Sequence, residues 1–217
     1  DEPVNGHTRA FMERLTEASV PFVDLFSVYT TARKDPETPT LYLERDTHWS
    51  PEGVHLAAKA VAERVIAEGW GQIGIADYQE IPVDISREGD VLLMAKSPSI
   101  TARFTPESIA CVQVIDPTTG QPYEDDPTSP ILVLGDSFLR IYQNDAPGSA
   151  GFIAHLAQEL RQPVASIVSD GGASTLVRQE LARKPEMLAG KKLVIWEFVE
   201  RDLRFGTEGW QLVKLGS

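Results

Sequence analysis

The sequence has one cysteine, four histidines and no long apolar run. Cys111 has no second cysteine to pair with inside the chain, so a core must stabilise the fold without disulfide bonds. The chain has no H-x-x-x-H pair and no cysteine cluster, which removes the common zinc motifs. No stretch reaches the ~18 to 20 apolar residues of a membrane-spanning helix, and no signal peptide is visible. We therefore expect no membrane span in this chain.

Basic residues are also scarce, since 20 Lys and Arg stand against 32 Asp and Glu, a formal net charge of −12. Nucleic acids are bound through basic faces that neutralise phosphates, so we expect no nucleic-acid partner. The content of apolar residues (42%) and of charged residues (24%) is ordinary for a globular protein. We expect one domain over residues 1–217, with an insertion at roughly 70–130. The chain opens at Asp1 without a methionine, and we expect it to be a processed or trimmed piece.

The second half of the chain alternates strands with helices. The apolar runs at 131–134, 163–168 and 192–198 are continuous, which is typical of strands buried on both faces. Helices are expected between them, at 148–161 and from the "SDGG" turn to about residue 184. This alternation predicts an α/β fold, a parallel sheet between two layers of helices.

The first half is predicted to add two helices, at 7–18 and 51–69, and Ser50 is the expected N-cap of the second. "VPFVDLF" (20–26) predicts a short strand, and a loop is expected over 27–45. The insertion is rich in glycine and proline and contains short apolar runs such as "DVLLMA" and "IACVQVID". We expect a few short strands there, packed on one edge of the main sheet.

A serine follows the strand 131–134 in "ILVLGDSF". In parallel sheets, active groups collect where strands end at the carboxyl edge. Gly135 allows a sharp turn, so that the hydroxyl of Ser137 projects from the rim and its N–H can bind a developing oxyanion. The G-x-S-x-G elbow is absent, because position 139 is Leu. A G-D-S tripeptide by itself also fits a turn in which Asp136 or Ser137 caps the next helix.

"RDTHW" places an acid two residues before a histidine. Side chains at i and i+2 of an extended segment point to the same side, so Asp46 can hold one imidazole nitrogen of His48. The other nitrogen can then take the proton that Ser137 must lose to become a good nucleophile. The two stretches together predict serine-dependent acyl transfer, which requires no cofactor.

A metal site is an alternative interpretation of the same residues. Asp46 and His48 are possible ligands, with His55 or Asp136 as a third, and the protein would then be a metal-dependent hydrolase.

"RDTHWSPEG" followed by "VLGDSF" resembles the alginate O-acetyltransferase family, the SGNH-hydrolase-like domains of the AlgJ and AlgX type. The resemblance covers nearly the whole chain and includes "REGDVLLM" and "LVIWEFVERDL". It implies a three-layer α/β/α, flavodoxin-like fold. It also implies a circularly permuted motif order, because ordinary SGNH hydrolases have the serine block first. Matched motif to motif, the nucleophile is Ser137, the base His48 and the orienting acid Asp46.

The resemblance also implies partners and a location. Family members move acetyl groups onto hydroxyls of exported polysaccharides in the bacterial periplasm or at that face of the inner membrane. The expected partners are therefore an acetyl donor, a polysaccharide acceptor and other exopolysaccharide-modification proteins, and any tether would lie in a segment outside these residues. Asn144 and Gly172 are the candidates for the oxyanion residues of SGNH proteins, and Arg178 is a candidate for orienting substrate. The alternative is a catalytically silent protein that binds polysaccharide or serves as a scaffold.

Overall fold

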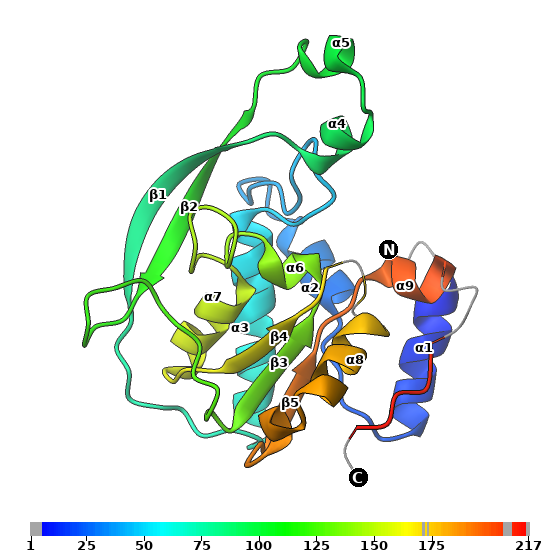
Figure 1. The fold of residues 1–217 in the computed structure, drawn as a ribbon, viewed down its shortest axis with the longest axis vertical. Helices are drawn as coiled ribbons and strands as arrows, with labels where there is room; N and C mark the ends of the chain where they lie inside the picture. Colours follow the sequence, from blue (N-terminus) through cyan, green and yellow to red (C-terminus); the bar gives the residue numbers. More distant parts are fainter. Residues whose placement is uncertain (1–5, 171, 173, 206–209, 216–217) are drawn as a thin grey trace.

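The computed structural model describes residues 6–170, 172, 174–205 and 210–215 (Figure 1). Its central sheet has β3 (Ile131–Gly135) between β4 (Ala165–Val168) and β5 (Leu193–Trp196). Both pairings are parallel, with Val133 opposite Ser166 on one side and Ile195 on the other. The three strands predicted from continuous apolar runs are confirmed, and every residue of β3 is buried.

Helices cover both faces of this sheet. Alternate side chains of β3 point to opposite faces, so this strand contributes to the core on each side. Ile131 and Val133 join a core cluster with α3 (Pro51–Ala67) and α7 (Phe152–Leu160). Leu132 and Leu134 join a second cluster with α8 (Leu176–Arg183). The predicted three-layer α/β/α architecture is therefore confirmed.

The helix α3 begins as its sequence predicts. The Ser50 hydroxyl accepts a hydrogen bond from the Gly53 N–H at 3.2 Å, Pro51 occupies the first turn, and Glu52 lies near the positive end of the helix. The side of α3 that faces the sheet carries small and branched apolar residues that are buried. The start of α3 is thus anchored, and so is the chain that leads into it.

The remaining helices lie around these layers. Among the described residues no helix is long and apolar enough to cross a bilayer. Outside the insertion, these remaining helices are α1 (Gly6–Glu17), α2 (Leu25–Ala32), α6 (Ser137–Arg140), α9 (Glu200–Phe205) and a 3₁₀ turn (Pro185–Leu188).

The predicted strand at 20–26 is wrong. Asp24 instead caps α2 by accepting a hydrogen bond from the Ser27 N–H at 3.2 Å, and residues 25–32, expected as strand and loop, are helical. A short apolar run does not distinguish a strand from the start of a buried helix. Here the helix is stabilised by the buried Tyr29, whose hydroxyl donates a hydrogen bond to the Gly53 carbonyl at 2.8 Å. The helix predicted at 148–161 is shorter at its start, since α7 begins at Phe152.

The insertion folds as an antiparallel hairpin of β1 (Gln79–Arg87) and β2 (Glu107–Ile115). This hairpin forms a sheet of its own, so its predicted place on an edge of the main sheet is wrong. The apolar side chains of β2 pack instead into the cluster that contains α3 and α7. "DVLLMA" is not a strand either: its first five residues form α4 (Asp90–Met94), and α5 (Pro98–Thr101) follows at the far end of the hairpin (Figure 1).

Candidate active site

The turn after β3 presents Ser137 as the first residue of α6. Asp136 is the N-cap, and its side chain accepts a hydrogen bond from the Phe138 N–H at 2.8 Å. A Cβ added to Gly135 would lie 2.4 Å from Leu139 Cδ1 and 2.5 Å from Glu197 Oε2, so any other residue here would displace these side chains. Ser137 is partly exposed, while the residues on both sides of it are buried.

The segment before α3 is closed by a narrow backbone pairing, and residues 44–48 within it are bent, not extended as expected from the sequence. The His48 N–H donates to Asp46 Oδ1 at 3.1 Å, which keeps the acid beside the ring. Tyr42 and Trp49 form an isolated antiparallel bridge, and the Leu43 N–H donates to the His48 carbonyl at 3.1 Å. The His48 ring packs against the Phe138 ring, with the centroids 4.8 Å apart. Ser50 is the N-cap of α3, so His48 lies two residues before this cap and is fixed in position relative to the helix.

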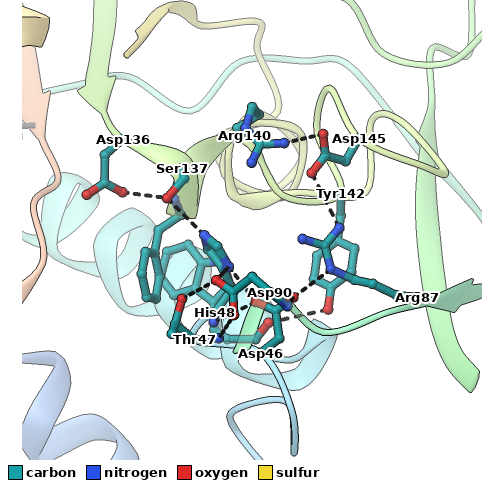
Figure 2. Close-up of polar contacts among 12 residues, drawn as sticks. Asp46, Thr47, His48, Arg87, Asp90, Asp136, Ser137, Arg140, Tyr142 and Asp145 are labelled. Atoms are coloured by element: carbon teal, nitrogen blue, oxygen red, sulfur yellow. Dashed lines mark hydrogen bonds and ion pairs between the residues drawn. The ribbon is translucent and has the colours of Figure 1, made fainter. Parts of the chain in front are cut away.

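These two segments meet, although 89 positions separate them in the sequence (Figure 2). His48 Nε2 lies 2.9 Å from Ser137 Oγ, and His48 Nδ1 lies 2.6 Å from Asp46 Oδ1. Asp46 and His48 are buried at 7% and 5% exposure, which shields both contacts from water. Serine, imidazole and carboxylate thus form one continuous hydrogen-bonded chain.

The second carboxylate oxygen of Asp46 is bound from the insertion. Arg87 Nε donates to Asp46 Oδ2 at 2.9 Å, and the Asp90 N–H donates to the same oxygen at 3.2 Å. Burial by itself would raise the pKa of Asp46, but the hydrogen bonds from His48 and Arg87 outweigh it and hold this pKa well below the usual range. Asp46 is therefore ionised at neutral pH.

The Asp90 side chain supports the same segment. Its carboxylate accepts hydrogen bonds from the Thr47 N–H at 2.8 Å and the Thr47 hydroxyl at 2.5 Å, and it lies 3.5 Å from His48 Nδ1. Neither Arg87 nor Asp90 was predicted as a site residue. "REGD" stands about forty positions after "DTH", and only the fold of the hairpin brings the two together.

A chain of ion pairs continues outward from Arg87. Its guanidinium lies 3.4 Å from Asp145, which is also paired with Arg140 (Figure 2). Arg140 Nε in turn donates to Asp170 at 2.8 Å. Arg140 lies on α6 and Arg87 on β1, so the network joins the serine helix to the hairpin.

Behind the serine turn, two acids lie against each other. Glu197, which follows β5, accepts a hydrogen bond from the Asp136 N–H at 3.2 Å. Burial raises the pKa of Asp136 and, more strongly, that of Glu197, whose pKa the neighbouring Asp136 raises further. This pair shares the turn with Ser137. Glu197 lies in "LVIWEFVERDL", one of the stretches that carry the family resemblance, but no role was predicted for it.

The metal alternative named His55 or Asp136 as the third ligand, and neither belongs to the group of possible ligands that the structure brings together. His55 lies on α3 and its Nε2 is 2.9 Å from the Nε2 of His155 on α7, while Asp136 caps α6. Among the described residues, Asp46, His48 and Asp90 do lie close enough to hold an ion. Both oxygens of Asp46 are already hydrogen-bonded, however, so a metal would have to displace Arg87 or His48.

The other three predicted site residues lie outside this hydrogen-bonded chain. Asn144 is exposed in the turn after α6, and Gly172 packs against Leu176 at the start of α8. Arg178 donates to the Ser174 carbonyl at 2.7 Å and lies over the rings of Trp196 and Trp210. Within the described residues no hydrogen bond joins any of the three to Ser137 or His48, so their roles stay predictions.

The layered fold, with a serine-histidine-aspartate chain at the carboxyl edge of its parallel sheet, defines an α/β domain of the SGNH-hydrolase-like class. Residues 2–200 match the family described as "SGNH hydrolase-like domain, acetyltransferase AlgX", and the chain belongs to this family. The comparison with curated proteins gives no match.

Two solved structures share the fold. The O-acetyltransferase domain of AlgJ from Pseudomonas putida has a TM-score of 0.66 at 21% identity, over 94% of this chain and 68% of that one. AlgX from Pseudomonas aeruginosa has a TM-score of 0.52 at 19% identity, over 75% of this chain and 36% of that one. The present chain thus spans about a third of the AlgX structure.

Proposed function

We propose that this chain is an O-acetyltransferase or acetylesterase that works through an acyl-serine intermediate. The observation that carries the proposal is the 2.9 Å contact between Ser137 Oγ and His48 Nε2, with Asp46 on the other ring nitrogen. A hydroxyl within reach of a base, itself oriented by a carboxylate, is the arrangement that activates a serine nucleophile. The family's description as an acetyltransferase supports acetyl as the acyl group.

In the first half-reaction, His48 Nε2 accepts the proton of Ser137 while Oγ attacks the carbonyl carbon of an acetyl ester. The N–H of Ser137 is the proposed donor to the oxyanion. The bond between the carbonyl carbon and the leaving oxygen then breaks, and that oxygen takes the proton from His48. Asp46 remains ionised beside Arg87 and stabilises the imidazolium while it exists.

In the second half-reaction, a hydroxyl group attacks the acetyl-serine and gives its proton to His48. The bond from Oγ to the carbonyl carbon breaks, and Ser137 recovers the proton. If the hydroxyl belongs to a sugar, the product is an acetylated glycan; if it belongs to water, the product is acetate. By likeness to AlgJ and AlgX, we propose an exported polysaccharide as acceptor and the bacterial periplasm as the location, with other exopolysaccharide-modification proteins as partners.

The test is hydrolysis of a small acetyl ester by the wild type and by Ser137→Ala, with the exposed Ser108→Ala as the matched control. The members of an assembled triad act as a unit, so Ser137→Ala should lower kcat/KM by about three orders of magnitude or more. Ser108→Ala should match the wild type. Unchanged turnover in Ser137→Ala would exclude the serine mechanism.

Two further measurements address the alternatives. A serine-directed phosphonate should label Ser137 in the wild type, whereas a silent binding protein would bind glycan without taking the label. The cluster of Asp46, His48 and Asp90 is the specific observation behind a metal-dependent hydrolase. Activity that is lost with chelator and restored by a metal ion would favour that function over the serine mechanism.

A further inference from the structure

The far end of the β1–β2 hairpin, residues 91–106, has apolar side chains that no core covers. We call it the distal segment; it contains most of α4 and all of α5, and Figure 1 places it at one end of the long axis of the molecule. None of its sixteen residues is buried. Five large apolar side chains along it are between 43% and 60% exposed: Val91, Leu93, Met94, Ile100 and Phe104.

Such a segment is not expected to be stable by itself. Helices of five and four residues are too short to persist without tertiary packing, and α4 and α5 bury no residue. Apolar side chains gathered at one exposed end of a molecule mark a surface that another body covers.

The charge of the distal segment differs from that of the rest of the chain. It contains Lys96 and Arg103 and no acidic residue, although the whole chain carries 32 acids and a net charge of −12. No other stretch between two acids in this sequence is as long. Arg45 adds a third cation, because its guanidinium lies 5.6 Å from the Phe104 ring centroid. Apolar side chains interspersed with cations, without anions, are complementary to an anionic lipid surface.

The base of the segment is tied to the candidate active site. The Val91 N–H donates to the Arg45 carbonyl at 3.3 Å, and the Arg45 guanidinium donates to the Thr105 carbonyl at 2.8 Å. Gly89 leaves no room for a side chain, since an added Cβ would lie 1.8 Å from the Arg45 carbonyl oxygen. Both ends of the segment are therefore held at the residue that precedes Asp46.

We propose that the distal segment is a membrane-contact surface that inserts its apolar side chains into the headgroup region of an anionic bilayer. Aliphatic side chains such as Leu93 and Met94 have no counterpart on a hydroxyl-rich polymer, whereas lipid acyl chains cover them directly. Because the segment is anchored at Arg45, binding would fix the position of the Ser137–His48 edge relative to the bilayer. The proposal does not depend on the proposed acyl transfer.

The experiment is co-sedimentation of the 217-residue chain with vesicles of phosphatidylcholine containing about 30% phosphatidylglycerol, or of phosphatidylcholine alone, at ~0.1 M salt, where charge attraction is only partly screened. The wild type should bind the anionic vesicles, and binding should weaken at higher salt. Leu93→Ser/Met94→Ser should lower the partition coefficient about tenfold or more, because two side chains no longer leave water. Lys96→Gln/Arg103→Gln should lower it about fivefold for each cation removed. All four side chains are exposed, so the thermal midpoint should stay unchanged.

Two control variants show whether binding belongs to the distal segment. Ile75→Ser removes an apolar side chain that is 93% exposed outside the segment and should bind vesicles as the wild type does. Ser137→Ala should also bind normally, so a failure of the proposed enzyme function leaves this test intact.

Three results would overturn the proposal. The first is no binding of the wild type to anionic vesicles; the second is equal binding by the wild type and both double variants. The third is self-association, or retention on an anionic polysaccharide, that the double variants abolish while vesicle binding is absent.

Discussion

Arg87 and His48 hold the two oxygens of the same buried carboxylate: Arg87 Nε lies 2.9 Å from Asp46 Oδ2, and His48 Nδ1 lies 2.6 Å from Asp46 Oδ1. The orienting acid is thus positioned from both sides, by the bent segment before α3 and by the hairpin. This relationship makes the hairpin part of the site and leads to the first prediction.

Replacing Arg87 should lower kcat without changing KM. Arg87→Met leaves the buried Asp46 with fewer partners, which raises the pKa of its carboxyl group and loosens the orientation of His48. We expect kcat for a small ester to fall about tenfold to a hundredfold, a fraction of the general-base contribution. Removing this cation from beside the Asp46–His48 pair favours protonation of the pair, so the acid limb of the pH–rate profile should move to higher pH. Arg87→Lys should recover part of the loss.

Arg64→Met is the matched control for Arg87→Met, because Arg64 pairs with Glu68 on the exposed side of α3. Removing that pair should change the free energy of unfolding by less than about 0.5 kcal/mol and leave the pH profile as it is. An Arg87→Met enzyme with a wild-type profile would show that Arg87 only stabilises the fold.

Glu197→Gln should change how stability depends on pH. The pKa of Glu197 is raised in the folded protein by burial and by Asp136, so the folded state keeps a proton that the unfolded chain releases above the ordinary value near 4.5. Stability from this group is therefore greatest at low pH and is lost as the pH rises toward the folded pKa. Glutamine can still accept the bond from the Asp136 N–H, so we expect a smaller decline of the thermal midpoint between about pH 4.5 and 8.

The comparison variant for this prediction is Glu197→Ala. It leaves the Asp136 N–H without its side-chain acceptor and should lower the free energy of unfolding by about 1–3 kcal/mol, with loss of activity as the serine turn shifts. Parallel pH curves for the wild type and Glu197→Gln would contradict the raised pKa.

The His55–His155 pair should have the opposite effect on the pH dependence of stability, stabilising the fold at higher pH. Burial lowers the pKa of His155 to about 3, with help from His55, and burial lowers that of His55 against Glu80, Glu52 and Glu159. Because both pKa values are lowered on folding, the unfolded chain binds protons more readily than the folded protein. Stability from the pair is therefore present above the ordinary value of about 6.5 and is lost as the pH falls.

Thermal midpoints of the wild type and of His55→Leu/His155→Leu between about pH 7 and 4 test this prediction, since that window brackets the unfolded-state pKa. The double variant should lose less stability on acidification. The exposed His7→Gln is the control and should follow the wild type. Equal acid sensitivity of the wild type and the double variant would show that the pair does not govern stability in this range.

Gly135→Ala should damage the serine turn directly. The added Cβ would lie 2.4 Å from Leu139 Cδ1 and 2.5 Å from Glu197 Oε2, so the turn must shift. We expect a loss of about 1–3 kcal/mol in the free energy of unfolding and a larger proportional loss of esterase activity. Gly6→Ala, which meets nothing within 4 Å, should change neither quantity. Full activity in Gly135→Ala would show that the turn tolerates a side chain.

The strands β3, β4 and β5 and the helix α3 were predictable because local signals agree with the tertiary environment. Continuous apolar runs match burial on both faces of a sheet, and Ser50 with Pro51 marks a helix start wherever the helix packs. The prediction failed where a short apolar run is compatible with either a strand or a helix. Residues 25–26 join a helix capped by Asp24, and "DVLLM" forms an exposed helix on the hairpin.

The sequence by itself determined the order of the layers and the chemistry available at the site, because residue spacing sets which side chains share a face and which groups can exchange a proton. Only the tertiary structure decided which residues complete the site. Arg87, Asp90 and Glu197 reach Asp46 and the serine turn from segments whose positions depend on long-range packing. The stretches "REGDVLLM" and "LVIWEFVERDL" contain these residues, but nothing in them shows which side chains they contact.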